Sequence, residues 1–151
     1  MPTVVDTLDG LTGLIGQPLE PSSWVEIDQQ RIDAFAEATG DHQWIHTDPE
    51  RAKDGPFGTT VAHGYLTLSL LIPMWTEILE VRSVATKVNY GLNKVRFPAP
   101  VPAGSKLRAT ATLAAVDPVP GGAQLTADVT VEIEGTAKPA CVAQLLVRFL
   151  R

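Results

Sequence analysis

Cysteine is almost absent from this sequence of 151 residues, in which Cys141 is the only one. A single cysteine cannot form an intramolecular disulfide bond, so non-covalent packing must hold the fold together. Cys141 lies in an apolar run. That setting favours a small buried side chain over a reactive thiol.

Positive charge and long hydrophobic runs are also scarce. The formal net charge is −5, whereas a nucleic-acid surface normally carries a basic excess. The longest strongly apolar stretch, residues 65–75, is too short to cross a bilayer. No Lys or Arg precedes Arg31, so the positive n-region of a secretory leader is missing. We therefore expect a cytoplasmic protein that neither binds nucleic acid nor inserts into a membrane.

The length and composition fit one folded domain. Hydrophobic residues make up 44% of the sequence and charged residues 19%, as in ordinary globular proteins. A chain of this length can bury most of its apolar surface. We expect a single domain over residues 1–151. Residues 1–20 are rich in glycine and are expected to form a loosely ordered N-terminal arm.

Two short helices are predicted before residue 60. Asp28 is a suitable N-cap for a helix that runs to about Thr39, and Gly40 can end that helix in a left-handed conformation. Asp48 and Pro49 are typical of the first positions of a second helix. The residues between Gly40 and Asp48 therefore lie in a connection between the two.

A longer helix of different character is expected to begin at His63 and Gly64 and to extend to Leu79. Large apolar side chains surround it almost completely: Leu66, Leu68, Leu70, Leu71, Ile72, Met74, Trp75, Ile78 and Leu79. A helix that is apolar all round is one buried in a core.

Most of the sequence after about residue 84 predicts strands. Apolar and polar residues alternate over residues 106–113 and 124–133, which gives each strand one buried and one wet face. Proline and glycine at 118–122 supply a turn. Taken over the eleven residues 124–134, the second of these strands would extend about 36 Å, and the apolar helix would extend about 24 Å. A long, curved antiparallel sheet wrapped around one buried helix satisfies both lengths, and this is an α+β architecture.

Asp41 and His46 are the most informative residues of the chain. They stand five positions apart in the connection that follows the first helix. A carboxylate and an imidazole on one loop can jointly hold one water molecule. Asp41 could instead cap the next segment, and His46 could be a histidine of the fold. The spacing alone leaves both interpretations open.

Two stretches of the sequence match a family pattern: residues 35–46, FAEATGDHQWIH, and residues 62–64, AHG. They resemble the MaoC-type (R)-specific enoyl-CoA hydratases, which have an aromatic residue, then Ser/Thr-Gly-Asp-x-Asn-Pro-hydrophobic-His, and then a helix that begins at a His-Gly pair. The resemblance covers most of the chain. Gln43 and Trp44 depart from the usual Asn and Pro. Neither change removes an acid or a base.

The resemblance implies the hot-dog fold and a hydratase reaction, in which water adds to a trans-2-enoyl-CoA to give an (R)-3-hydroxyacyl-CoA. Asp41 and His46 would hold the water and handle its proton, and which of them is the formal base stays open. The backbone N–H of Gly64, at a helix N-terminus, would stabilise negative charge on the thioester oxygen. No cofactor is expected, because coenzyme A is part of the substrate.

Four further residues are candidates for substrate binding. The amide of Gln43 could position the loop or a substrate. His63 could hold the start of the helix, or it could take part in the reaction. Lys94 and Arg96 could meet the phosphates of coenzyme A or could be solvated residues at a strand end.

A metal site is the alternative chemistry for the same loop. His42 and His46 have the spacing that puts two imidazoles on one face of a helix. The segment follows a helix-stopping glycine, and no third ligand has suitable spacing, so we expect no metal.

Three other functions stay open besides the hydratase. They are a dehydratase of (3R)-hydroxyacyl groups on acyl carrier protein, a hot-dog acyl-CoA thioesterase and a non-catalytic acyl-binding subunit. A half-wrapped sheet leaves edge strands that a second copy would cover, so a homodimer is expected.

Overall fold

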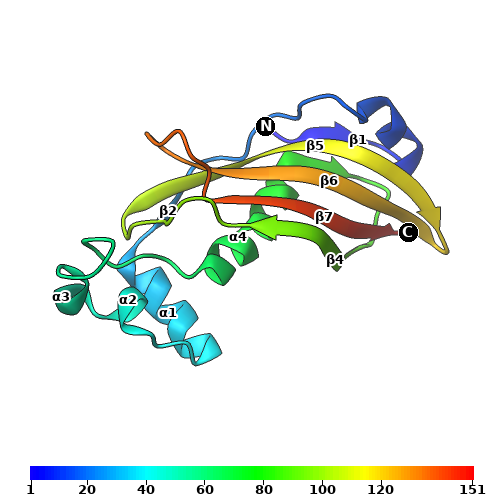
Figure 1. Ribbon diagram of the computed structural model, residues 1–151. Coiled ribbons are helices and arrows are strands. Elements are labelled where there is room, and N and C mark those ends of the chain that lie inside the picture. The colour runs from blue at the N-terminus through cyan, green and yellow to red at the C-terminus, as the bar shows by residue number, and fades with distance from the viewer.

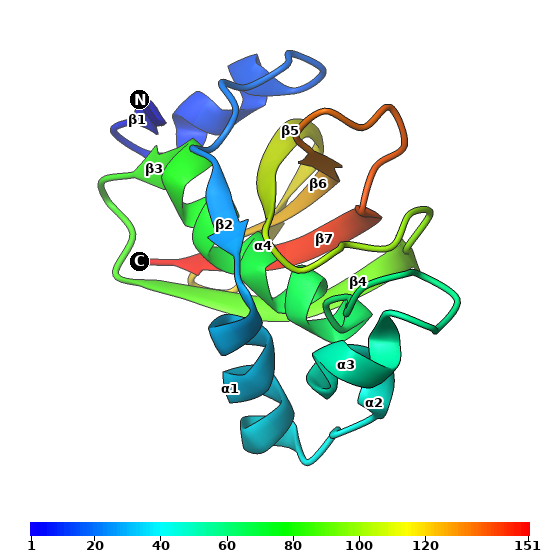
Figure 2. The same cartoon turned by 90° about the vertical axis from the view of Figure 1, so that its left-hand side faces the viewer.

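A curved antiparallel sheet dominates the computed structural model, which describes residues 1–151 (Figure 1). Its five strands lie in the order β2 (Val25–Ile27), β5 (Ser105–Val119), β6 (Gly122–Ile133), β7 (Cys141–Leu150) and β4 (Thr86–Arg96). Figure 2 shows the long helix α4 (Gly64–Ile78) inside the curve of this sheet. The arrangement is the hot-dog fold, which the family resemblance implied.

The period-two sequence pattern creates the buried face of the sheet. Every second residue from Leu107 to Leu113 in β5 and from Leu125 to Ile133 in β6 is buried. Ala109 lies opposite Val131 in this ladder, and residues paired in this way share one face. Thirty buried residues from the sheet, α4 and the N-terminal segment form one hydrophobic cluster.

The helix α4 is buried on one side only, which corrects the prediction of a helix surrounded by core. Leu71 and Trp75 face the sheet and are almost fully buried, whereas Tyr65 is 71% exposed and Leu68 and Ile72 are half-buried. The exposed side faces β4, an edge strand that has no neighbour beyond it. None of the helices combines the length and the hydrophobicity that a membrane span requires.

The first 20 residues are packed against the sheet, so the expectation of a loosely ordered arm is wrong. β1 (Thr3–Val5) pairs in parallel with β3 (Leu79–Val81), and the 3₁₀ helix η1 (Leu8–Leu14) follows it beside β5 (Figure 1). Backbone N–H groups of this segment donate to carbonyl groups of β5. Three leucines supply the apolar contacts that outweigh the flexibility of the glycines: Leu8, Leu11 and Leu19.

The helix α1 (Gln29–Thr39) begins and ends where the sequence predicted. The Asp28 carboxylate accepts a hydrogen bond of 2.8 Å from the N–H of Arg31, which satisfies one free amide of the first turn. Gly40 ends the helix with a φ of 80°, a left-handed conformation that glycine adopts without strain.

Two shorter helices, α2 (Trp44–Thr47) and α3 (Pro49–Ala52), follow α1. The Asp48 carboxylate accepts from the N–H of Arg51, so Asp48 caps α3 as predicted. Figure 1 shows α1, α2 and α3 together at one end of the molecule, below the start of α4.

Candidate active site

His46 lies in α2 with its side chain turned into the protein, and the residue is only 8% exposed. Its Nδ1 atom is 2.7 Å from the carbonyl oxygen of Val61. A carbonyl oxygen can only accept, so Nδ1 carries the proton and Nε2 of the neutral ring is left with a lone pair. The imidazole is therefore held in the form that can take a proton through Nε2.

The backbone around His46 is held as firmly as its ring. The N–H of His46 donates to the carbonyl oxygen of Gln43 at 3.0 Å, and the carbonyl oxygen of His46 accepts from Nε2 of Gln29 at 2.7 Å. The N–H of Val61 donates to the carbonyl oxygen of Ile45 at 3.0 Å. These bonds join α2 to the segment that leads into α4.

Asp41 approaches His46 from the connection after α1. The left-handed conformation of Gly40 turns the chain out of the helix, and the Asp41 carboxylate accepts from the N–H of Gln43 at 3.3 Å. One side-chain ligand atom each from Asp41, His46 and His63 lie within 4.8 Å of one another. Asp41 is exposed, so its carboxylate is open to a substrate. The structure thus brings the acid and the imidazole together.

His63 stands behind this pair. Its ring stacks on that of His46, with centroids 3.9 Å apart and planes at 24°, and contacts Phe35 on another side. Its Nε2 is 3.0 Å from the carbonyl oxygen of Asp41, so Nε2 carries the proton. The residue is 2% exposed, and its buried Nδ1 has no hydrogen-bond partner. His63 therefore supports both members of the pair and has almost no surface for a substrate.

Gly64 is the first residue of α4, and its N–H donates no hydrogen bond in the structure. Amides at this position have no acceptor inside the helix and lie at its positive end. The residue lines a cavity of about 280 Å³ together with Thr67, Phe57 and Phe97. A Cβ atom at residue 64 would lie 3.2 Å from the Phe97 ring. Glycine therefore leaves the approach to this amide open.

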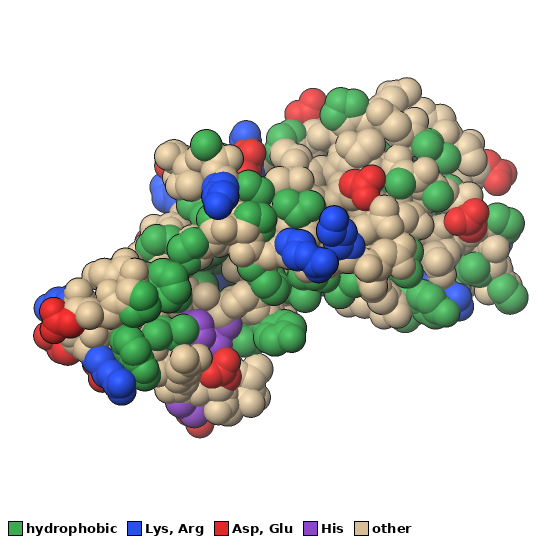
Figure 3. Space-filling view, viewed as in Figure 1, with side chains coloured by type: hydrophobic (Ala, Val, Ile, Leu, Met, Phe, Trp, Pro, Cys, Tyr) green, Lys and Arg blue, Asp and Glu red, His purple; other side chains and the backbone are tan.

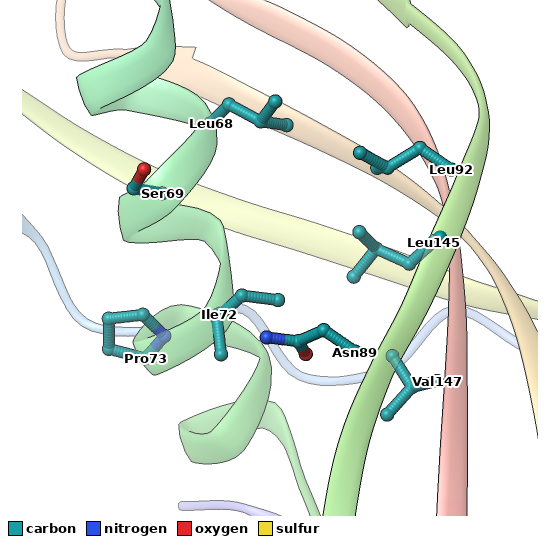
Figure 4. A pocket seen from close by; sticks show the side chains of 9 residues that line it. Leu68, Ser69, Ile72, Pro73, Asn89, Leu92, Leu145 and Val147 are labelled. Carbon is teal, nitrogen blue, oxygen red and sulfur yellow. The ribbon is translucent and has the colours of Figure 1, made fainter.

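A larger groove runs along the exposed side of α4. It has a volume of about 550 Å³ and separates α4 from β4 and β7. In Figure 4, Leu68 and Ile72 of the helix point across it towards Leu92, Leu145 and Asn89. Its walls are mostly apolar. We call this feature the α4 groove.

Lys94 and Arg96 are not brought to the Asp41–His46 pair. They lie opposite Gln144 and Val142 in the ladder of β4 and β7. The β7 residues that alternate with Gln144 and Val142 are buried. Both cations therefore point to the outer face of the sheet, on which Figure 3 shows a group of Lys and Arg side chains. Phe97, the next residue, is the one that reaches Gly64.

Gln43 and Trp44, the two departures from the family pattern, lie at the start of α2. Gln43 is exposed beside the pair. The Trp44 ring packs against Gly55 and under the Arg51 guanidinium, 4.2 Å from the ring centroid. A Cβ atom at residue 55 would lie 2.8 Å from the Trp44 ring, so any side chain larger than that of glycine would displace the ring. Side-chain packing thus anchors the loop where the family usually has proline.

Asp41, His46 and His63 also form the one group of potential metal ligands in the structure. One nitrogen of each imidazole already donates to a carbonyl oxygen. The atoms left as potential metal ligands are the other nitrogen of each ring and the carboxylate of Asp41. The pair considered from spacing, His42 with His46, does not form. His42 points outwards and lies 3.6 Å from the carboxylate of Glu37.

Cys141 is fully buried in β7, as its apolar surroundings predicted. Loss of hydration on burial raises the pKa of its thiol to about 11. The thiol is therefore neutral at physiological pH and is no candidate nucleophile.

Three residues that hold His46 were not expected from the sequence: Gln29, Thr60 and Val61. Val61 acts through its backbone, which has no sequence signal. Gln29 and Thr60 are ordinary polar residues at positions 17 and 14 residues from His46, and only the fold brings them to it.

Comparison with known proteins gives consistent matches. A family model described as MaoC like domain matches residues 11–135. A protein of Mycobacterium tuberculosis named 3-hydroxyacyl-thioester dehydratase Z is 52% identical over 146 residues, which cover 96% of this chain and 97% of that protein. Nodulation protein N of Rhizobium leguminosarum bv. viciae is 47% identical over 133 residues, covering 85% of this chain and 82% of that protein.

Solved structures agree with the fold. R-hydratase PhaJ1 of Pseudomonas aeruginosa superposes with a TM-score of 0.74 and 20% sequence identity. The match covers 91% of this chain and 82% of that one. At this identity the likeness shows that the two proteins share the hot-dog fold.

Proposed function

The chain belongs to the MaoC-like domain family and is a hydro-lyase, and from this premise we propose that it is an (R)-specific enoyl-CoA hydratase. It would add water reversibly to a trans-2-enoyl-CoA and give an (R)-3-hydroxyacyl-CoA. The relative at 52% identity is named for dehydration of 3-hydroxyacyl thioesters, which is the same reaction in reverse. The observation that carries the proposal is the His46 imidazole, protonated on Nδ1 and close to the Asp41 carboxylate.

The proposed chemistry needs two proton acceptors at one water molecule. Water can donate one hydrogen to Nε2 of His46 and one to the Asp41 carboxylate, which directs its oxygen lone pairs towards Cβ of the enoyl group. As the C–O bond forms, one of the two groups takes a proton from the water and returns it to Cα. The water is consumed whole, and both side chains end in their starting states.

Gly64 would stabilise the negative charge that develops on the thioester oxygen. Electrons from the C=C bond move onto that oxygen when water attacks Cβ. The free N–H of Gly64, at the N-terminus of the 15-residue helix α4, can donate a hydrogen bond to the oxyanion. A single donor of this kind is worth about 10²–10³-fold in kcat.

The α4 groove offers a place for the acyl chain. Leu68 follows Gly64 by four residues, so the groove begins one turn along α4 from the proposed oxyanion donor. Its apolar walls suit a hydrocarbon chain. Proton transfer and oxyanion stabilisation are supplied by the protein itself, so the proposed reaction uses no metal or organic cofactor.

We further propose that the protein works as a homodimer. β4 is an edge strand of 11 residues that pairs with β7 alone. It exposes Val88, Tyr90 and Leu92, and a second copy would cover these side chains and unpaired backbone groups. Light scattering coupled to size-exclusion chromatography tests this proposal. A monomer at micromolar concentration would contradict it.

The decisive experiment follows the loss of crotonyl-CoA absorbance with purified protein. Asp41→Asn and His46→Gln should each lower the rate about 100-fold or more, which corresponds to about 2.7 kcal/mol. Asp54→Asn and His42→Gln are matched controls at exposed residues nearby and should retain activity. Rates within a few-fold of wild type for both site variants would refute the mechanism.

The same assay separates the alternatives. A dehydratase of acyl carrier protein substrates would use the same residues, so kcat/KM for crotonyl groups on coenzyme A and on the carrier protein decides between the two. Release of free coenzyme A from a saturated acyl-CoA would favour a thioesterase. A non-catalytic subunit would show none of these activities.

A further inference from the structure

Hydrogen bonds of the Gln29 side chain hold His46 from behind, although Gln29 has no part in the proposed reaction itself. The side-chain amide of Gln29 uses both of its ends. Its Nε2 donates to the carbonyl oxygen of His46 at 2.7 Å and to Oδ1 of Asp33 at 2.9 Å, and its Oε1 accepts a hydrogen bond from the hydroxyl of Thr60. Thr60 is 2% exposed. We call these contacts the Gln29–Thr60 bracket.

The bracket joins the two chain segments that together orient the imidazole. Thr60 directly precedes Val61, whose carbonyl oxygen accepts the proton on Nδ1 of His46. Gln29 therefore holds the His46 backbone and, through Thr60, the segment that holds the His46 ring. Its own helix is fixed in the protein interior by Ile32 and Ala36, both fully buried.

We infer that Gln29 and Thr60 are positioning residues that keep His46 protonated on Nδ1, with Nε2 free to take a proton. The side-chain amide donates to the His46 carbonyl oxygen through Nε2 and accepts from Thr60 through Oε1. A carboxylate at position 29 would lose both donated bonds and would face the carboxylate of Asp33. The effect on turnover rests on the proposed function, whereas the state of the imidazole does not.

Variants at both residues test the inference. Gln29→Met keeps the length of the side chain without its polar atoms, and Thr60→Val keeps its shape without the hydroxyl. Thr60→Ser retains the hydroxyl and should behave as wild type. Gln30→Met is the matched control, because Gln30 is exposed on the same helix and makes no side-chain hydrogen bond.

Two measurements separate positioning from a general contribution to stability. Long-range ¹H–¹⁵N correlation spectra report which ring nitrogen of His46 is protonated. Wild type, Thr60→Ser and Gln30→Met should show Nδ1–H alone, whereas Gln29→Met and Thr60→Val should show a mixture of the two tautomers. For these two variants kcat should also fall about tenfold or more, with KM changed by less than about threefold.

The outcomes are distinct. If Gln29→Met and Thr60→Val lower only the unfolding temperature, and His46 keeps its Nδ1–H form and its kcat, the inference is overturned. If wild type does not hydrate crotonyl-CoA, the proposed function fails, and the spectra still decide whether the bracket controls the imidazole. Gln29→Glu, which keeps the acceptor for Thr60, serves if Gln29→Met does not fold, and a wild-type spectrum would count against the inference.

Discussion

Gly64→Ala is expected to separate activity from stability. The added methyl group would project into the cavity that Gly64 and Phe97 line, with its carbon 3.2 Å from two atoms of the Phe97 ring. That contact is only a few tenths of an ångström too close, and Phe97 is 43% exposed, so its ring can move. Gly64 is helical and has no positive φ, so alanine fits the backbone.

The expected magnitudes follow from these contacts. Alanine is favoured over glycine in helices by up to about 1 kcal/mol. This gain offsets the crowding of Phe97, so we expect the free energy of unfolding to change by less than about 1 kcal/mol. Complete loss of an oxyanion donor costs about 10²–10³-fold in kcat. Alanine keeps the N–H and hinders its approach, so we expect a loss of about 10- to 100-fold in kcat/KM.

Crotonyl-CoA hydration and thermal unfolding measure the two effects. Gly13→Ala is the control, because a Cβ atom there would meet nothing within 4 Å. A folded Gly64→Ala variant with kcat/KM within twofold of wild type would refute the proposed role of this amide. The double variant Gly64→Ala/Phe97→Leu tests the cause. Restored activity would show that displacement of Phe97, rather than the blocked amide, had lowered the rate.

Two further predictions concern residues outside the reaction. Burial raises the pKa of Cys141 to about 11 from 9.0, so the stability that the protonated thiol contributes is complete below pH 9 and is lost as the pH rises towards 11. Urea unfolding between pH 8 and 11 should therefore show that the free energy of unfolding falls more steeply with pH for wild type than for Cys141→Ala. Parallel decreases in the two proteins would contradict a raised pKa for Cys141. Gly55→Ala should destabilise the protein by about 1–3 kcal/mol through overpacking, because its Cβ would lie 2.8 Å from the Trp44 ring. Trp44→Leu in the same chain should recover most of that loss.

Local sequence patterns predicted much of the fold correctly. The alternation in β5 and β6 matches the buried residues, because neighbouring side chains of a strand point to opposite faces. Asp28 and Gly40 mark the ends of α1 because capping depends on a few adjacent residues. The pairing of Asp41 with His46 was predictable for the same reason, since the two residues stand only five positions apart.

The wrong expectations concern contacts between distant parts of the chain. The N-terminal segment looked flexible from its glycines, yet its leucines reach the core that the sheet provides. Composition predicted a fully buried α4, but a curved sheet of five strands covers only one side of the helix. For Lys94 and Arg96 the sequence left coenzyme A binding and solvent exposure open, and it did not show that the register of β4 on β7 turns both side chains to the outer face of the sheet.

The sequence by itself indicated an antiparallel sheet around a helix, and an acid and an imidazole five residues apart, because both follow from patterns of neighbouring residues. Its resemblance to a known family implied the hot-dog fold. Only the tertiary structure decided how that imidazole is held. The carbonyl oxygen of Val61 fixes the proton on Nδ1 of His46, and the His63 ring stacks on the His46 ring. The side chain of Gln29 holds the His46 backbone. These three residues come from other segments, and their contacts exist only once the sheet and α4 have brought those segments together.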